Sequence, residues 1–298
     1  AQARVLLMAA LAADIPAAPR VLGGLLLDTL EALGAAPLDD GAAAVLSRLW
    51  ERAHGAGEKL RAERIDDGPT PDTARMQLGP ALDVVSASRG SPYPLMLVGP
   101  HWRLQVNPWR GTARLALNAL YLATVEHADV AAECERIGCW LWRGRAEWRV
   151  SRLDVAADVV GLDVARFARL DECVTRAAGA RVHVDGEEHT ERSAKLASRH
   201  GHVETVTLGS AGSSVQVCIY DKAREMKASG KTWQAEHAKG RGWDGVEPLT
   251  RIEARFRRAA FDELDGARLR DVRAALAWSS VAPRLWAYAT KKAVRYCT

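Results

Sequence analysis

Charged and apolar side chains alternate without interruption from Arg251 to Arg257. This period of two predicts a β-strand, because successive side chains of a strand point to opposite faces of a sheet. The polar face carries Arg251, Glu253, Arg255 and Arg257. A solvated outer face is one explanation of the pattern. The other is a metal ligand, Glu253, set among arginines that contact phosphates.

A second strand is predicted over Glu147–Val160. Period two places Arg152, Asp154 and Asp158 on one face of it. Three charged residues on an otherwise apolar strand are costly to bury without partners. A metal ion or an ion-pair network would remove that cost, and a solvated face with salt bridges is the simpler alternative.

A third segment, Val215–Tyr220, is a short predicted strand that follows a turn of small residues and leads into a helix near Lys222. A tyrosine at the end of a strand lies at the rim of the sheet and is a candidate nucleophile. Its ordinary pKa is about 10, so it needs a nearby cation or metal to react well. Lys222 shares a strand face with Tyr220. A packing tyrosine whose hydroxyl caps a loop is the alternative.

These segments read "SRLDVAADVV", "TLGSAGSSVQVCIYDKARE" and "PLTRIEARFRR", and "RLWAYATKKAVR" follows them near the end. Their types and order resemble the signature segments of the Rep_trans family of replication initiation proteins. That family includes rolling-circle plasmid initiators, phage-type initiation factors and relaxases of integrative elements. Each motif is short, and the resemblance rests on their order and spacing over roughly Val84 to Arg295.

The resemblance implies a DNA-nicking and closing enzyme that initiates rolling-circle replication. Tyr220 would attack one strand at an origin and leave a 5′-phosphotyrosine and a free 3′-hydroxyl primer, with Lys222 assisting. The implied metal is Mg²⁺ or Mn²⁺, and the implied ligands are Asp154 and Glu253, with Asp158 as a third candidate. The implied DNA-binding residues are Arg152, Arg251, Arg255 and Arg257. The implied partners are single-stranded or supercoiled origin DNA, a host helicase and polymerase, and a second copy in a homodimer.

Two alternatives remain open at this point. One is a non-catalytic origin-binding or regulatory protein with the same fold. The other is a tyrosine recombinase, because Tyr288 and Tyr296 lie near the C-terminus, although the spaced Arg, Lys and His set of that class is not found.

The predicted fold class is α+β, a mainly antiparallel sheet with helices on one face. A β-α-β texture occurs before and after about Ala180, which suggests duplicated halves. Residues 1–65 are expected to form a small helical segment, residues 66–75 a linker and residues 76–298 the initiator domain. Two apolar stripes at helical spacing support the first segment. They are Leu22, Leu25, Leu26, Leu30 and Leu33, and then Val45, Leu46, Leu49 and Trp50.

Further along the chain, helices are predicted over Val125–Ile137 and Asp163–Ala178, a hairpin over Tyr93–Val106, and long polar loops over Glu187–His202 and Ser229–Glu247. The pair His200 and His202 is read as loop histidines rather than metal ligands.

The remaining signals concern partners and compartment. From residue 251 onward there are eleven Lys and Arg against five Asp and Glu, which suits a polyanionic partner. Five cysteines without a C-x-x-C pair indicate reduced thiols in a cytosol, and no segment is long and apolar enough for a membrane. Several tryptophans lie near arginines, as in surfaces that stack unpaired bases, and core packing explains them equally well. They are Trp102, Trp109, Trp140, Trp142 and Trp148.

Overall fold

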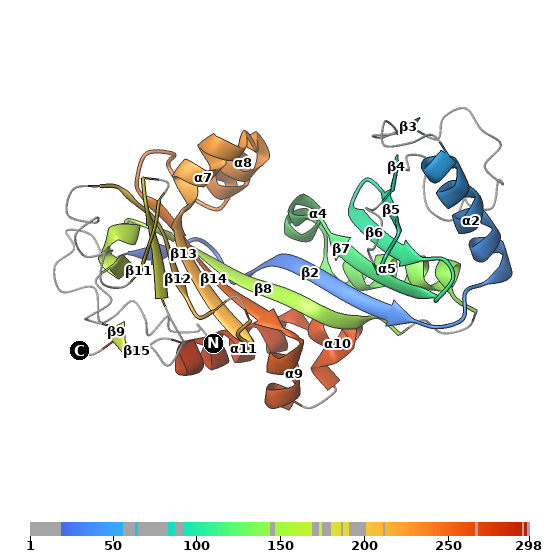
Figure 1. The fold of residues 1–298 in the computed structure, drawn as a ribbon. Helices are drawn as coiled ribbons and strands as arrows, with labels where there is room; N and C mark the ends of the chain where they lie inside the picture. Colours follow the sequence, from blue (N-terminus) through green and yellow to red (C-terminus); the bar gives the residue numbers. More distant parts are fainter. Residues whose placement is uncertain are drawn as a thin grey trace. The chain divides into compact units, whose positions relative to one another are not determined.

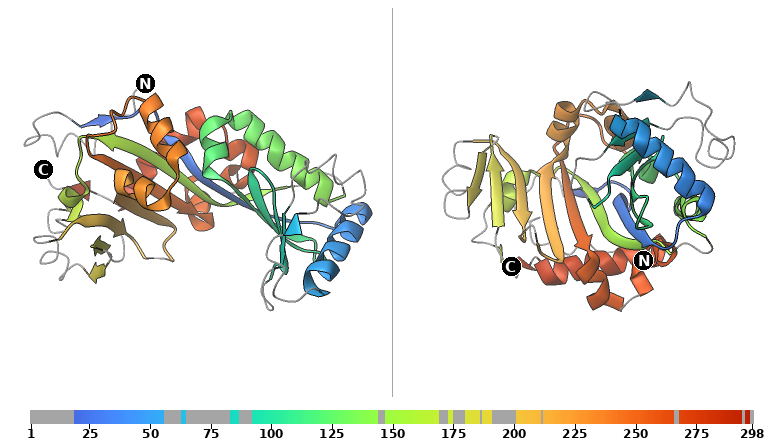
Figure 2. Two further views of the ribbon diagram at one scale, coloured as in Figure 1. Left: turned by 90° about the horizontal axis from the view of Figure 1, so that it is seen from above. Right: turned by 45° about the vertical axis from the view of Figure 1, so that its right-hand side comes forward.

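The computed structural model describes residues 19–55, 63–64, 83–86, 92–143, 147–168, 173–174, 180–185, 187–190, 201–210, 212–265, 268–293 and 295–296. The chain divides into two compact units. The first unit comprises Ala1–Asp28, Asp154–Leu264 and Ser279–Thr298, and the second comprises Thr29–Leu153 and Asp265–Trp278. Figures 1 and 2 show the helices and strands of each.

The first unit contains an antiparallel sheet with the strand order β11-β10-β12-β13-β14-β8, and β1 pairs with β8. The main strands are β1 (Arg20–Val21), β8 (Arg149–Val160), β10 (Ala180–Val184), β11 (Glu187–Thr190), β12 (Val203–Leu208), β13 (Val215–Asp221) and β14 (Leu249–Arg257). Of β8, the residues from Asp154 onward belong to this unit. β9 (Cys173–Val174) and β15 (Arg295–Tyr296) form a separate pair. The helical elements are η3 (Val164–Ala168), α7 (Lys222–Ser229), α8 (Thr232–Gly240), α9 (Arg258–Asp265) and α11 (Trp278–Ala293). α7 and α8 lie on one side of this sheet, and α9 and α11 on the other (Figure 1).

The second unit contains a sheet with the strand order β2-β7-β6-β5-β4-β3. Its strands are β2 (Leu26–Ala35), β3 (Glu63–Arg64), β4 (Asp83–Ser86), β5 (Leu95–Val98), β6 (Trp102–Asn107) and β7 (Thr112–Leu117), paired antiparallel throughout. Its helical elements are α2 (Asp40–Gly55), α4 (Ala119–Thr124), α5 (His127–Leu141), η5 (Arg268–Arg270) and α10 (Val272–Ala275). The core includes Leu97, Leu104, Leu115 and Ile137, all without exposed surface or nearly so.

The predicted α+β class with a mainly antiparallel sheet is confirmed. The helix predicted from the Val45–Trp50 stripe is confirmed as part of α2. The predicted hairpin is confirmed as β5 and β6. Strands were also expected where β12, β13 and β14 occur. The linker expected over residues 66–75 lies outside the described residues.

Four local predictions are wrong. The polar loop expected over Glu187–His202 begins with strand β11, which pairs with β10. The leucine stripe from Leu22 to Leu33 does not form a helix, because residues 26–35 are strand β2 and pair with β7. Within Asp163–Ala178, the described residues form the short turn η3 and the strand β9 where a single helix was expected. The polar loop expected over Ser229–Glu247 contains helix α8.

The two units share a strand order. In each unit, a long strand that comes first in the chain lies beside a strand that comes much later. Beyond that later strand, the neighbours follow in reverse chain order. The order is β2-β7-β6-β5 in one unit and β8-β14-β13-β12 in the other. The outer strands differ. The repetition expected around Ala180 therefore has a counterpart in the topology, but the chain passes from one unit to the other at Leu153 and Asp154.

In the part of the chain that the structure describes, none of the helices combines the length and apolar character that crossing a bilayer requires.

Candidate active site

The end of β13 brings Tyr220 to the polar face of the first unit's sheet. β13 stops at Asp221 because this residue caps α7: its Oδ1 accepts a hydrogen bond from the backbone N–H of Arg224 at 2.9 Å. Tyr220 lies opposite Arg251 on β14, and Cys218 lies opposite Glu253. Directly opposed residues share a face of the sheet, so Tyr220, Arg251 and Glu253 project to the same side.

The hydroxyl of Tyr220 donates a hydrogen bond to Oε2 of Glu253 at 3.2 Å. The other oxygen of Glu253, Oε1, accepts from Nε of Arg255 at 2.6 Å. The side chain of Asp154 is also hydrogen-bonded to Glu253. Asp154 is fully buried and Glu253 is 3% exposed, whereas Tyr220 is half-buried. Four of the residues named by the sequence motifs therefore meet in one cluster, the Tyr220 cluster of Asp154, Tyr220, Glu253 and Arg255.

The contact between Asp154 and Glu253 bears on metal binding. Two adjacent buried carboxylates repel one another, and a hydrogen bond between them requires a shared proton. A divalent cation would remove the same repulsion, and Mg²⁺ sites commonly use one or two carboxylates together with water and substrate phosphate. Among the described residues, no group of three or more His, Cys, Asp or Glu side chains is arranged to hold a metal. The pair fits a site of two protein carboxylates that is completed by substrate.

Arg251 belongs to a separate ion-pair network on the same face. Its Nε and Nη2 donate to both oxygens of Asp158 at 2.6 and 2.9 Å, and its Nη1 donates to Asp28 at 2.5 Å. Asp158 also receives a bond from Arg241 at 2.9 Å. Burial raises the pKa of Asp158, but the two guanidinium groups outweigh it and hold the pKa below its usual value. Both oxygens of Asp158 are thus taken by arginines, so we leave this residue out of the metal site.

The surroundings of Tyr220 oppose its ionisation. Burial raises the pKa of its hydroxyl well above the ordinary value, and the charge of Glu253 raises it further, while Arg251 acts in the opposite direction. The ammonium of Lys222 lies 5.7 Å from the centre of the Tyr220 ring. It is 3% exposed and donates to Glu225 at 2.6 Å and to Gln234 at 3.1 Å. Burial lowers the pKa of Lys222. Tyr220 therefore needs an added positive charge, or removal of its proton, to become a good nucleophile.

The other predicted arginines differ in their surroundings. Arg152 belongs to the second unit, where it lies 3.9 Å from Glu31. Arg257 is exposed at the end of β14. A third of the Arg255 side-chain surface is exposed, although its Nε is bonded to Glu253. Arg255 and Arg257 are thus placed to reach a bound phosphate, and Arg251 is occupied within the protein.

Several residues that complete the site were not predicted from the sequence motifs. Asp28 lies in a segment that was expected to be helical. Arg241 follows α8, where a loop was expected, and also donates to the carbonyl of Leu22. Glu225 and Gln234 come from α7 and α8 and hold Lys222. No periodic pattern marks these four residues. Asp28 and Arg241 act through pairings between distant parts of the chain, and Glu225 and Gln234 act through contacts within α7 and α8.

The alternative candidates have other contacts. The hydroxyl of Tyr288 donates to Glu263 at 2.6 Å, and Tyr296 lies on β15. His200 is outside the described residues, and Nε2 of His202 lies 3.3 Å from Asp221. None of these contacts joins the Tyr220 cluster.

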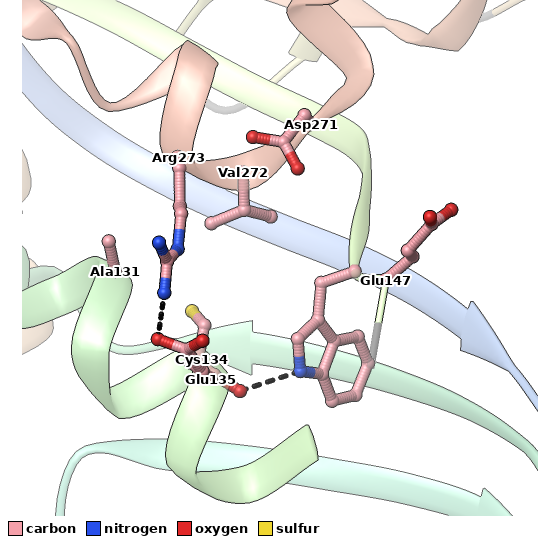
Figure 3. A pocket seen from close by; sticks show the side chains of 8 residues that line it. Ala131, Cys134, Glu135, Glu147, Asp271, Val272 and Arg273 are labelled. Carbon is pink, nitrogen blue, oxygen red and sulfur yellow. Dashed lines mark hydrogen bonds and ion pairs between the residues drawn. The ribbon is translucent and has the colours of Figure 1, made fainter. Parts of the chain in front are cut away.

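A pocket of about 330 Å³ lies in the second unit (Figure 3). It is lined by Ala131, Cys134, Glu135, Glu147, Trp148, Asp271, Val272 and Arg273. Arg273 is ion-paired with Glu135, and Asp271 caps α10 by accepting from the backbone of Ala274. These polar groups already serve the fold, so we place the candidate site at Tyr220.

No protein-family model matches this chain, and a search of curated proteins finds no match to it. The resemblance to Rep_trans proteins is carried by the motifs alone.

Proposed function

We propose that this protein is a rolling-circle replication initiator, a site-specific endonuclease and strand transferase of the Rep_trans type. The observation that carries the proposal is the hydrogen bond from the Tyr220 hydroxyl to Glu253, whose carboxylate also meets Asp154 and Arg255. Three separate sequence motifs supply these four residues. A phenol bonded to a carboxylate beside a partly exposed guanidinium suits nucleophilic attack on a phosphodiester.

In the proposed reaction, the Tyr220 oxygen forms a bond to phosphorus and the bond from phosphorus to the 3′-oxygen breaks. The phenolic proton passes to Glu253, which already accepts a hydrogen bond from it. The DNA keeps a 5′-phosphate on Tyr220, and the released 3′-oxygen takes a proton from water to become the primer hydroxyl. The covalent bond conserves the phosphodiester energy, so rejoining requires no ATP.

The cationic residues support charge on the phosphate. Arg255 and Arg257 would hold the non-bridging oxygens. Asp28 and Asp158 keep Arg251 close to Tyr220, where its charge favours the phenolate. A Mg²⁺ or Mn²⁺ ion held by Asp154 and Glu253 would neutralise phosphate charge when bound. In the cytoplasm, a host helicase would then unwind the duplex and a host polymerase would extend the primer. Two copies acting as a homodimer would suit repeated strand transfer.

The proposal is tested with a supercoiled plasmid that carries the DNA flanking the protein's own gene. We expect relaxed circles and a protein–DNA adduct, and mass spectrometry of the adduct should place the phosphate on Tyr220. Tyr220→Phe should keep DNA binding and form no adduct, and Tyr288→Phe should behave as the unmodified protein. An adduct that persists in Tyr220→Phe would refute the assignment of Tyr220.

The second candidate is a non-catalytic origin-binding protein. The strong rise in the pKa of Tyr220 favours it, because a phenol that stays protonated is a poor nucleophile. Tight binding of the flanking DNA without relaxation or adduct, with Mg²⁺ or Mn²⁺ present, would support this candidate.

A further inference from the structure

The five tryptophans near arginines separate into two groups. Trp102, Trp140, Trp142 and Trp148 are buried in the second unit, with exposed fractions between 2% and 7%. Trp109 is 60% exposed. Exposing an indole forfeits the free energy gained by burying a large apolar surface, so an indole held in solvent by a rigid backbone needs a reason.

Trp109 lies in the turn between β6 and β7, and its backbone is firmly held. Oδ1 of Asn107 accepts hydrogen bonds from the backbone N–H groups of Trp109 and Arg110, at 3.1 and 3.0 Å. Nδ2 of Asn107 donates to the carbonyl of Pro92 at 3.0 Å. Gly111 ends the turn with φ 62°, a left-handed conformation that favours glycine.

The turn is also tied to the core beneath it. The carbonyl of Gly111 accepts from the indole Nε1 of buried Trp142 at 2.8 Å and from the backbone N–H of Ala36 at 3.2 Å. A Cβ on Gly111 would collide with the carbonyl of Ala36. The tip of this hairpin is therefore preorganised, and little conformational entropy remains to be lost when something binds to it.

Two neighbours shape the exposed surface. Trp50 of α2 contacts Trp109 nearly edge to face, with ring centroids 5.0 Å apart and an interplanar angle of 82°. This contact fixes the orientation of the Trp109 ring while most of its surface stays in solvent. Arg110, the next residue in the chain, is exposed and adds a positive charge to the same turn. An exposed aromatic ring and a guanidinium carried by one turn match an unpaired base and its phosphate.

We propose that Trp109, with Trp50 and Arg110, forms a stacking surface for an unpaired base of single-stranded DNA. The proposal rests on the DNA-processing function above, because a nicking enzyme must hold its strand away from the scissile phosphate as well as at it. Trp109 supplies the face on which the base stacks, Trp50 supports the ring, and Arg110 contacts the adjoining phosphate.

The test measures binding of fluorescently labelled oligothymidylate by anisotropy. Base–aromatic stacking is worth about 1–3 kcal/mol, so Trp109→Ala should weaken binding by about 5-fold to 150-fold. Trp109→Phe should recover much of the loss. Leu120→Ala, which removes another exposed apolar side chain of the same unit, should have no effect. With an oligonucleotide of abasic sites, Trp109→Ala should bind as well as the unmodified protein.

A second measurement locates the contact directly. Oligothymidylate with 5-iodouracil should crosslink under near-ultraviolet light to the peptide that contains Trp109. Equal binding by the Trp109→Ala variant, or an equal loss on abasic DNA, would overturn the proposal, as would absence of binding to any single strand. Stacking at Trp109 in a protein that never forms an adduct would refute only the nicking function. If the protein nicks DNA and the Trp109→Ala variant binds single strands as well as the unmodified protein, only the stacking surface is refuted. The exposed ring would then be assigned to contact with a protein partner.

Discussion

Arg251 shows how the neighbours of a residue decide its role. By sequence it is one of four alternating charges on a strand, and it was expected to bind DNA. In the structure it is 7% exposed and bonded to Asp158 and Asp28. Burial lowers the pKa of Arg251, but the two carboxylates raise it above the ordinary value, so its charge is permanent. The charge of Arg251 acts to lower the pKa of Tyr220. In the proposed reaction, phosphate binding would be left to Arg255 and Arg257.

Asp158→Asn should destabilise the protein strongly. It removes the negative charge that Arg251 and Arg241 share and, among the described residues, leaves Arg251 paired only with Asp28. Removing one partner of a buried ion pair typically costs about 3–5 kcal/mol. Urea unfolding at neutral pH would measure the loss. Glu247→Gln is the control: it breaks an exposed pair with Arg20 and should cost about 1 kcal/mol or less.

The same pair predicts a dependence on pH. The folded-state pKa of Asp158 lies below its ordinary value of 3.8, so its contribution to stability is complete above that value. The contribution disappears as the pH falls through the lower folded-state value. The unmodified protein should therefore have a higher free energy of unfolding than Asp158→Asn at every pH except in strong acid. A difference in the free energy of unfolding that disappears near pH 6 would contradict this assignment.

The sequence is informative about the site wherever a single strand decides the outcome. Alternation along β14 indicates that Glu253 and Arg255 share a face, and they are hydrogen-bonded. It does not reveal which aspartate of β8 binds the arginines. Asp158, and not Asp154, pairs with Arg251 and Arg241, and this depends on pairings between distant segments. Asp28 was not recognisable at all, since its segment has the composition of a helix.

At the scale of elements, β2 shows why composition can mislead. Leucine and alanine favour helix intrinsically, and the leucines recur at helical spacing. In the sheet, however, Leu30, Ala32 and Gly34 are buried in alternation, as pairing with β7 requires. Tertiary pairing overrides the local preference. α8 was missed for the opposite reason: it buries only Gln234 and Ala238, so it carries almost no apolar stripe.

Packing of β2 against Trp142 predicts a local sensitivity. A Cβ added at Gly34 would collide with Cη2 of Trp142, whereas among the described residues no atom lies within 4 Å of a Cβ added at Gly24. Gly34→Ala should destabilise the fold by about 1–3 kcal/mol through overpacking. Gly24→Ala should be close to neutral. Thermal unfolding of the two variants side by side makes the comparison, and equal melting temperatures would argue against this packing.

For the whole molecule, cleavage should require Mg²⁺ or Mn²⁺. EDTA should stop formation of the adduct, and either ion should restore it, because hard oxygen ligands favour these metals over softer ones. Asp154→Asn and Glu253→Gln should each remove the response to added metal while DNA binding persists. Full activity in chelator would show that the carboxylate pair works with a proton alone.

The proposed phosphate contacts can be tested by salt dependence. Removal of one arginine that binds a phosphate should lower the log–log slope of single-strand binding by about 0.7. Arg257→Ala should flatten the slope for all sequences equally and leave any origin preference intact. Arg181→Ala, which removes an exposed arginine paired with Glu188 on another edge of the sheet, is the control. An unchanged slope in Arg257→Ala would reassign this arginine to the protein surface.

The bond between Asp28 and Arg251 has a consequence for biosynthesis. The two residues are 223 positions apart, so Asp28 emerges from the ribosome long before its partner exists. At about 5–20 residues per second, the delay is roughly 10–45 seconds. Tyr220 and Glu253 also cannot meet until β14 has been made. A chain that stops before β14 would thus lack the carboxylate that accepts the hydrogen bond from Tyr220, and it could not carry out the proposed cleavage.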